Sequence, residues 1–246
     1  MIIRERIVEV DSFNKEDAIT FGNHKEIYKN AVYFDLEHYV YKKPKCIGVF
    51  GACYYDEKEN NIKVTQYMIE NKNEGKEILY LAKRYFIDIC SNKKKKYIVT
   101  FSGNNDFTVI NYLFAKYGIN FNFNDYFKSV DIQKIYENIF KKGIGLKALE
   151  KKFGIIREGE LISGSNLAKT FHKVLKDREY FERMPKEKIE KILIYNEQDV
   201  VNLFKILVNW NSFVEKEKEL LKEEESIEIE VEKNDEEKND EEKKAL

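Results

Sequence analysis

Acidic side chains occur in three separate places where a strand is expected to end or a helix to begin. Asp35 and Glu37 close an apolar run that starts at Ala31, and Asp106 follows a second apolar run and a Ser-Gly-Asn-Asn turn. The third place is the sequence Tyr-Asn-Glu-Gln-Asp at 195–199, inside a segment with helical spacing. Carboxylate oxygens are the ligands that hard divalent cations prefer. If the three segments meet, they could hold a pair of such ions, which is a common way to hydrolyse a phosphodiester.

Each of these features alone has an ordinary explanation. On a strand, Asp35 and Glu37 point to one face, and the simplest alternative is a solvated strand end. Asp106 could be an ordinary helix N-cap. Tyr195 and Asp199 lie at i and i+4 on one helix face, and both could face solvent. What favours a metal site is the conjunction of the three, because ionised carboxylates that share a buried face repel each other until a cation binds.

Segments with strand and helix periodicity would position these acids. A hairpin-rich start is followed by β-α-β units, which indicates a mixed sheet with helices on its faces. Helical spacing of apolar residues recurs between the later strands, and a last long helix carries the Tyr-Asn-Glu-Gln-Asp sequence. Residues 2–10 could form an additional edge strand. Apolar, aromatic and β-branched residues predict five strands, at 31–37, 46–54, 62–69, 97–101 and 126–130.

Composition limits the class of protein. The 246 residues are 43% apolar and 14% aromatic, which is enough for one domain with a substantial core. The three cysteines, Cys46, Cys53 and Cys90, form no Cys-x-x-Cys pair, which argues against a disulfide framework and against a zinc site. The N-terminus lacks the apolar stretch of a signal peptide, and no run is long enough to span a membrane. We therefore expect a cytoplasmic protein without a membrane partner.

Charge is unevenly distributed along the chain. Residues 214–246 hold 15 acidic and 7 basic side chains, whereas residues 1–213 hold 36 basic and 29 acidic ones. A mildly basic body is compatible with a nucleic acid partner. We divide the chain into an N-terminal extension at 1–30, one α/β domain at 31–213, and an acidic tail that is expected to be largely disordered. The tail could bind a protein partner.

Four short segments carry a resemblance to a known family. The chain resembles the DEDD superfamily of 3′-to-5′ exonucleases, and within it the family of predicted prokaryotic RNase H-like exonucleases. That superfamily divides by the residue before its last aspartate, which is Tyr at four positions before or His at five. Tyr195 stands four before Asp199, so the match is to the tyrosine branch, DEDDy. The matching segments are Tyr-Phe-Asp-Leu-Glu at 33–37, Phe-Ser-Gly-Asn-Asn-Asp at 101–106, Gly-Leu-Lys-Ala-Leu-Glu at 145–150 and Tyr-Asn-Glu-Gln-Asp-Val at 195–200.

The resemblance implies both a fold and a set of roles. The fold is the RNase H-like three-layer α/β fold, with a mixed five-stranded sheet in the order 3-2-1-4-5 and strand 2 antiparallel. Asp35 would bridge two divalent ions, Mg²⁺ or Mn²⁺. Glu37 and Asp199 would complete the first metal site, and Asp106 would hold the second ion. Tyr195 would orient the attacking water.

Three positions depart from the usual family motifs. His38 stands where the family often has Thr, while Ser102 and Asn105 replace an Asn and a Phe of the second motif. Since the family contacts the terminal nucleotide there, the resemblance implies a substrate-binding role for these three residues. A separate basic stretch could follow a phosphate backbone or could simply be a solvated helix face; it comprises Lys141, Lys142, Lys147, Lys151, Lys152 and Arg157.

The function expected from the sequence is metal-dependent 3′-5′ exonuclease activity on single-stranded or frayed nucleic acid, by a two-metal-ion mechanism. Two alternatives remain at this point. One is an RNase H-like endonuclease that cuts inside a strand. The other is a non-catalytic nucleic-acid-binding or interaction module.

Overall fold

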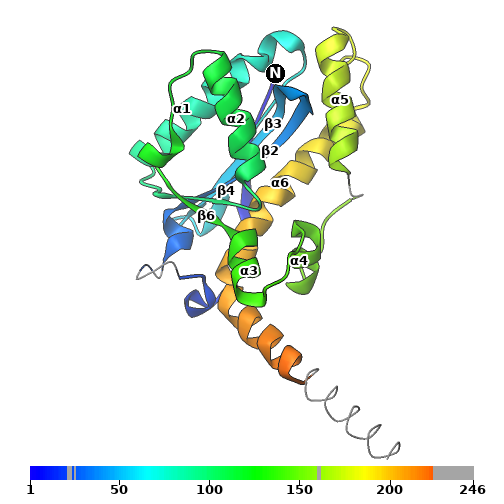
Figure 1. Cartoon of the computed structure of the whole chain (residues 1–246). Coiled ribbons are helices and arrows are strands. Elements are labelled where there is room, and N and C mark those ends of the chain that lie inside the picture. The colour runs from blue at the N-terminus through cyan, green and yellow to red at the C-terminus, as the bar shows by residue number, and fades with distance from the viewer. Residues whose placement is uncertain (21–23, 25, 160–161, 224–246) are drawn as a thin grey trace, which may run out of the picture.

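The computed structural model describes residues 1–20, 24, 26–159 and 162–223. Six strands form one sheet, and helices cover both of its faces (Figure 1). The strands are β1 (Ile2–Glu9), β2 (Ala31–Tyr41), β3 (Lys43–Asp56), β4 (Asn61–Met68), β5 (Tyr97–Thr100) and β6 (Lys128–Asp131). The α-helices are α1 (Glu77–Ser91), α2 (Asn104–Lys116), α3 (Ile132–Phe140), α4 (Leu146–Lys152), α5 (Gly164–Lys176) and α6 (Lys186–Val208).

The strand order is β1-β4-β3-β2-β5-β6. The five predicted strands are β2 to β6, and their predicted order 3-2-1-4-5 is confirmed as β4-β3-β2-β5-β6. The second of them, β3, is antiparallel to both of its neighbours, as predicted. The β2–β3 hairpin is longer than predicted, because the chain turns within one residue at Lys42, whose φ is 59°.

The predicted count of five strands was one too few. β1 pairs antiparallel with β4 along its whole length, from Ile2 opposite Met68 to Glu9 opposite Asn61. It is an edge strand in which Ile3 and Ile7 are largely exposed. A strand with one solvated face and one free edge gives a weak sequence signal. The segment assigned to an N-terminal extension therefore contributes a strand to the sheet.

The two faces of the sheet pack against different helices. Alternate residues of β2 point to opposite faces, so Phe34 lies in the core with α1 and α2, where its ring meets that of Phe86. Tyr33 lies in the other core, with its ring 5.7 Å from that of Phe204 on α6. Asp35 and Glu37 follow Tyr33 by two and four residues, so their side chains point to the same face of the sheet as Tyr33. The sequence of β2 therefore directs both acids toward α6.

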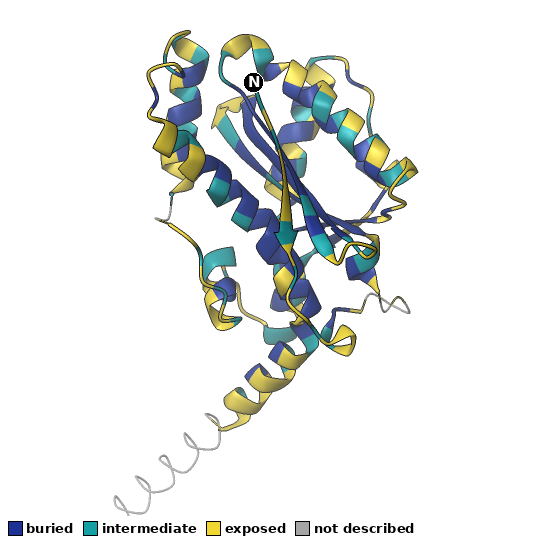
Figure 2. Ribbon diagram, turned by 180° about the vertical axis from the view of Figure 1, so that it is seen from behind, coloured by how far each residue is buried: buried dark blue, intermediate teal, exposed yellow. Residues whose placement is uncertain are grey.

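Helix α6 crosses the sheet on this face, and its second half is almost entirely buried (Figure 2). The apolar residues predicted for its inner face, among them Val200, Leu203 and Leu207, are buried in the second core. Helical structure continues over 210–223. The rest of the predicted acidic tail lies outside the described residues. Within the described part of the chain, no helix combines the length and apolarity needed to cross a membrane.

Candidate metal centre

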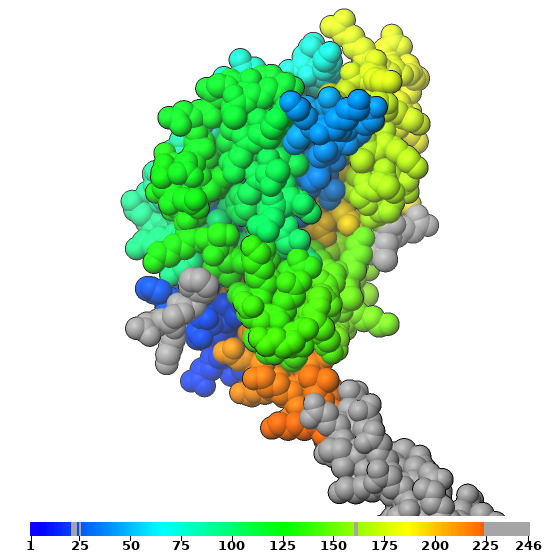
Figure 3. Space-filling model, viewed as in Figure 1, coloured from blue at the N-terminus to red at the C-terminus, as the bar shows by residue number. Residues whose placement is uncertain are grey.

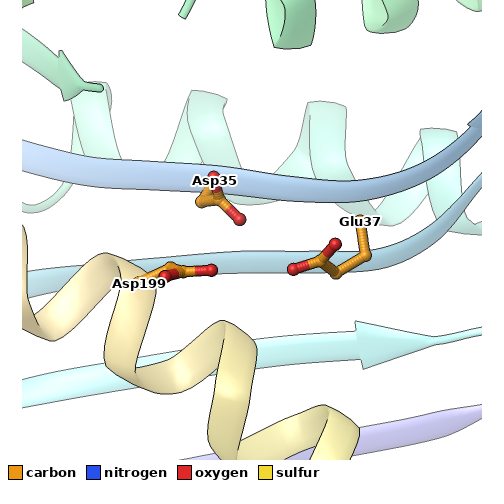
Figure 4. A group of neighbouring side chains, drawn as sticks. All are labelled: Asp35, Glu37 and Asp199. Carbon is orange, nitrogen blue, oxygen red and sulfur yellow. The ribbon is translucent and has the colours of Figure 1, made fainter. Parts of the chain in front are cut away.

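Three of the predicted acids converge between the sheet and α6. Asp35 and Glu37 come from β2, and Asp199 comes from α6 (Figure 4). One carboxylate oxygen from each lies within 4.8 Å of the others, close enough for one cation to contact all three. Glu37 and Asp199 are buried and Asp35 is partly buried. The alternative that these acids are solvated is therefore wrong.

Asp106 lies beside this cluster, outside the group of three. It is in the first turn of α2, with only 7% of its surface exposed. The N-cap of α2 is Gly103, so the reading of Asp106 as an ordinary N-cap is wrong. The negative charge of Asp106 raises the pKa values of Asp35 and Glu37, which places the carboxylate within electrostatic reach of both.

Burial and mutual repulsion make the four carboxylates hard to ionise. Burial is the largest cause for each, followed for Asp35, Glu37 and Asp106 by the charge of Asp199. The pKa of Asp35 lies well above its ordinary value, and the pKa values of Glu37 and Asp106 rise to about 8. The pKa of Asp199 rises less, to about 6, because the charge of Arg157 opposes the effect of burial on the carboxylate.

A chain of amide side chains holds Asp35 in place. Gln66 on β4 donates hydrogen bonds to the Leu193 carbonyl and to Oδ1 of Asn196, at 2.8 and 2.9 Å. Asn196 in turn donates to Oδ2 of Asp35 at 3.3 Å. A Cβ on Gly51 would lie 2.1 Å from Oδ1 of Asn196, so only glycine leaves room for this side chain. The network fixes Asp35 relative to α6 through Oδ2 and does not involve Oδ1 of Asp35.

Arg157 fixes Asp199 from the other side. It pairs with Glu150 through two hydrogen bonds of 2.6 and 2.7 Å, and its Nη2 also donates to Oδ1 of Asp199. Asn202 donates to the same Glu150 carboxylate at 2.9 Å. The hypothesis that Arg157 belongs to a surface basic stretch is therefore wrong, since its side chain is only 8% exposed. The ion pair still leaves Oδ2 of Asp199 available to a cation.

Tyr195 lies one helical turn before Asp199, between two cations. The Lys147 ammonium and the Arg157 guanidinium lie 4.7 and 5.2 Å from the centroid of its ring. Burial and the charges of Asp199 and Glu37 nevertheless raise the pKa of Tyr195 far above its ordinary value. The phenol is therefore neutral, and it can donate a hydrogen bond to a water or a phosphate.

Of the three predicted substrate-binding residues, His38 is on β2 with Asp35, Asn105 is on α2 with Asp106, and Ser102 lies in the turn before α2. His38 directly follows Glu37 at a bulge of β2, and its Nδ1 is buried without a hydrogen-bond partner among the described residues. Burial also lowers the pKa of His38, which keeps the ring neutral. Ser102 has a φ of 55°, and its backbone N–H donates to Asp131 at 3.0 Å. Asn105 is exposed in the first turn of α2.

The donor set suits divalent metal ions. Clustered carboxylate oxygens without sulfur or imidazole favour Mg²⁺-like or Mn²⁺-like cations. A cation among Asp35, Glu37 and Asp199 would remove the repulsion that raises their pKa values. Figure 3 shows the molecular surface hollowed between α2, the β2–β3 hairpin and α5, with atoms of α6 on the floor. A ligand can therefore approach α6 from this side.

Sequence reasoning missed the residues that support the acids. Glu150 and Asn196 lie inside segments that carry the family resemblance, and Gly51 is a glycine within a strand, which often marks a close approach of another group. Those signals were available in the sequence. Gln66 gave no signal, because its role depends on β4 and α6 meeting in space.

The fold and the acidic centre together define an α/β domain of the RNase H-like class. The family model RNase_H_2, described as RNase_H superfamily, matches residues 32–211. The chain therefore belongs to the RNase H superfamily, and this membership indicates a nuclease-type hydrolase whose substrate is nucleic acid. Neither the curated proteins nor the solved structures that were compared gave a match.

Proposed function

We propose that the protein is a metal-dependent 3′-5′ exonuclease that hydrolyses single-stranded or frayed nucleic acid by a two-metal-ion mechanism. The observation that carries this proposal is the convergence of Asp35, Glu37 and Asp199 within 4.8 Å, with Asp106 beside them. Tyr195, four positions before Asp199, supports the assignment to the DEDDy branch. The products would be 5′-mononucleotides.

In this proposal Asp35, Glu37 and Asp199 would hold one divalent ion, Mg²⁺ or Mn²⁺, and Asp35 and Asp106 would hold a second. When bound, such ions neutralise charge on the scissile phosphate and lower the pKa of the attacking water. Asn196 keeps Asp35 oriented toward α6. Arg157 holds one oxygen of Asp199 so that the other faces the centre.

Tyr195 acts as a positioning group for the attacking water. Its raised pKa means that the phenol keeps its proton near neutral pH, so it donates a hydrogen bond and does not act as the base on its own. The ammonium group of Lys147 and the guanidinium group of Arg157 both lie close to the Tyr195 ring, at 4.7 and 5.2 Å from its centroid. The side chains of Lys147 and Arg157 would also place positive charge beside the reacting phosphate.

The terminal nucleotide would contact His38, Ser102 and Asn105. The buried Nδ1 of His38 supports this assignment, because a buried polar atom without a partner is costly unless a ligand completes it. Ser102 and Asn105 stand at the start of α2, on either side of the turn that delivers Asp106. These contacts would orient the 3′ end toward the acids.

End-labelled oligonucleotides test this function directly. Matched DNA and RNA strands, with a free or blocked 3′ end, are incubated with Mg²⁺, Mn²⁺ or chelator and resolved on a gel. We expect a ladder of single-nucleotide steps that needs the metal and a free 3′ end. Internal cuts in a 3′-blocked strand would instead indicate the endonuclease. Binding without any cleavage would indicate the non-catalytic module.

A further inference from the structure

A second polar cavity lies between α5 and α6, away from the carboxylates. Its volume is about 390 Å³. Four lysines line it, Lys169 and Lys173 from α5 and Lys188 and Lys191 from α6, together with Tyr180. None of the described residues that line it is acidic. A cavity with this lining attracts an anion.

The lysines gather around one aromatic ring. The ammonium groups of Lys173 and Lys188 lie 5.5 and 5.9 Å from the centroid of Tyr180. Lys188 is half-buried and donates to the Tyr180 hydroxyl at 3.3 Å. Like charges that share a cavity repel each other, and a bound anion removes the repulsion. The hydroxyl and the ammonium groups together offer several donors to phosphate oxygens.

This cavity is aligned with the metal centre along α6. Lys188, Lys191, Tyr195 and Asp199 follow one another at intervals of three, four and four residues, so they share one face of the helix. From Asp199 to Lys188 the helix rises roughly 16 Å. A smaller cavity beside Tyr195 is lined by Arg157, Glu158 and also Lys191. Lys191 therefore belongs to both cavities and connects them.

The position of the cavity and the metal centre along one face of α6 indicates which class of molecule would occupy the cavity. A single-stranded nucleic acid carries a phosphate on every nucleotide, so a strand with its 3′ end among the acids presents further phosphates at regular intervals. A free phosphate or mononucleotide would fill only one of the two positions. Lysine contacts to phosphates are independent of base sequence and serve to position the strand.

We propose that the cavity between α5 and α6 is a subsite for an internucleotide phosphate of the substrate strand, a few nucleotides before its 3′ end. This subsite rests on the proposed function, because that function places the 3′ end at Asp35 and Asp199. It makes α5 part of the substrate-binding surface. It also predicts that strands long enough to reach Lys188 bind better than dinucleotides.

Binding in the presence of chelator tests the subsite without hydrolysis. The variant is Lys173→Gln with Lys188→Gln, and the probes are a fluorescent single-stranded oligonucleotide and a dinucleotide. For the oligonucleotide we expect roughly tenfold or greater loss of affinity and a salt-dependence slope reduced by about 0.7, since each phosphate contact on a single strand contributes about 0.7. Affinity for the dinucleotide should be the same in the variant and in the wild type.

A matched double variant controls for the loss of two positive charges. Lys205→Gln with Lys216→Gln removes two exposed lysines from the far end of α6 and the helix after it, and it should bind the oligonucleotide like the wild type. Equal losses in the two variants would overturn the subsite in favour of general charge attraction. An equal loss for the dinucleotide would overturn it in favour of a terminal-nucleotide site.

The subsite and the proposed function fail in different ways. If the wild type hydrolyses oligonucleotides but the cavity variant binds them normally, the subsite is overturned and the exonuclease assignment stands. If binding depends on Lys173 and Lys188 but no metal produces cleavage, the subsite is supported and the exonuclease assignment fails. A wild type that binds no oligonucleotide in chelator and cleaves none with metal overturns both. Circular dichroism and thermal melting establish that each variant is folded.

Discussion

The buried carboxylates beside α6 differ in how their charge is balanced: Glu150 comes from α4, and Asp35 and Glu37 come from β2. Glu150 is paired with Arg157 by two hydrogen bonds and with Asn202 by a third. Within the part of the chain that the structure describes, neither Asp35 nor Glu37 forms an ion pair; Asp35 accepts one long hydrogen bond from Asn196. Asp199 lies between the two groups, since Arg157 holds one of its oxygens. We call Glu150 the paired acid. We call Asp35, Glu37 and the neighbouring Asp106 the unpaired acids.

The difference separates a structural role from a functional one. A buried carboxylate with a full set of partners stabilises its surroundings and gains nothing from a ligand. Buried carboxylates that repel each other cost folding free energy, and a cation removes that cost. The comparison therefore predicts opposite responses. Mutation of an unpaired acid should cost activity and spare stability, and mutation of the paired acid should cost stability.

The largest expected effect is the loss of activity in Asp35→Asn. Asp35 is the acid assigned to both ions, so we expect cleavage to fall by at least about a thousandfold, or about 4 kcal/mol of transition-state stabilisation. In chelator the variant should be at least as stable as the wild type, because one repelling charge is gone. Cleavage kinetics and urea unfolding measure the two effects. Glu59→Gln, an exposed carboxylate in the β3–β4 turn, is the control; full activity in Asp35→Asn would refute the metal centre.

The paired acid should behave in the opposite way. Glu150→Ala leaves Arg157 and Asn202 without their carboxylate partner in a buried position, and breaking such a pair costs at least about 3 kcal/mol of unfolding free energy. Urea unfolding in chelator measures this loss. Glu219→Ala, on an exposed position of the last helix, should change stability by less than about 0.5 kcal/mol. A loss in Glu150→Ala no larger than that of the control would contradict the distinction between the two groups.

Metal should stabilise the protein through the unpaired acids together with Asp199. At a Mn²⁺ concentration about 100 times the dissociation constant, the unfolding free energy should rise by about 2.7 kcal/mol relative to chelator. Thermal melting with and without Mn²⁺ measures the shift. Asp35→Asn should lose most of the shift, whereas Glu59→Gln should keep it. If Mn²⁺ raises the melting temperature of Asp35→Asn as much as that of the wild type, the ion binds elsewhere.

Tyr195→Phe should have a smaller effect on activity than Asp35→Asn. The ring remains in place between Lys147 and Arg157, and only the hydroxyl that positions water is lost. We expect kcat to fall about tenfold, or about 1.4 kcal/mol, with Mn²⁺ stabilisation unchanged. Steady-state kinetics and melting on the same preparation measure both. A loss as large as that in Asp35→Asn would show that the hydroxyl takes a proton in the reaction.

The sequence was sufficient for the parts of the fold that depend on local pattern. The five strands β2 to β6, their order and the common face of Asp35 and Glu37 follow from periodicity, strand geometry and the family resemblance. β1 was left as an alternative, because Ile3 and Ile7 are exposed and its pairing with β4 joins residues far apart in the chain. The burial of the Arg157 side chain against Glu150 and Asp199 was also missed, because the pairing of Arg157 with Asp199 joins residues far apart in the chain. A basic residue in a basic stretch shows no sign in the sequence of a buried Glu150 partner.

The last expected effect, which is spread over several pH units, is the pH dependence of stability in chelator. Glu37 and Asp106 have pKa values of about 8 in the folded protein, whereas ordinary carboxyls in the unfolded chain titrate near 4. Between these values the folded state binds more protons than the unfolded state, so stability must fall as pH rises from about 5 to 8. The fall should be on the order of 1 kcal/mol per pH unit. Saturating Mn²⁺ should reduce it, because a bound cation favours the ionised carboxylates.

Asp35→Asn isolates the part of this pH dependence that belongs to the unpaired acids. The pKa of Asp35 lies well above its ordinary value in the folded protein, so the variant loses one carboxyl that binds a proton in the folded state and not in the unfolded state, and the slope of stability against pH in chelator should be shallower than in the wild type. Urea unfolding at several pH values gives both slopes. Glu150→Ala is the comparison variant, because Glu150 lies outside the cluster of Asp35, Glu37 and Asp199. Parallel slopes in the wild type and Asp35→Asn would mean that the repulsion among the acids is already relieved without a cation, and the physical reason for metal binding would be lost.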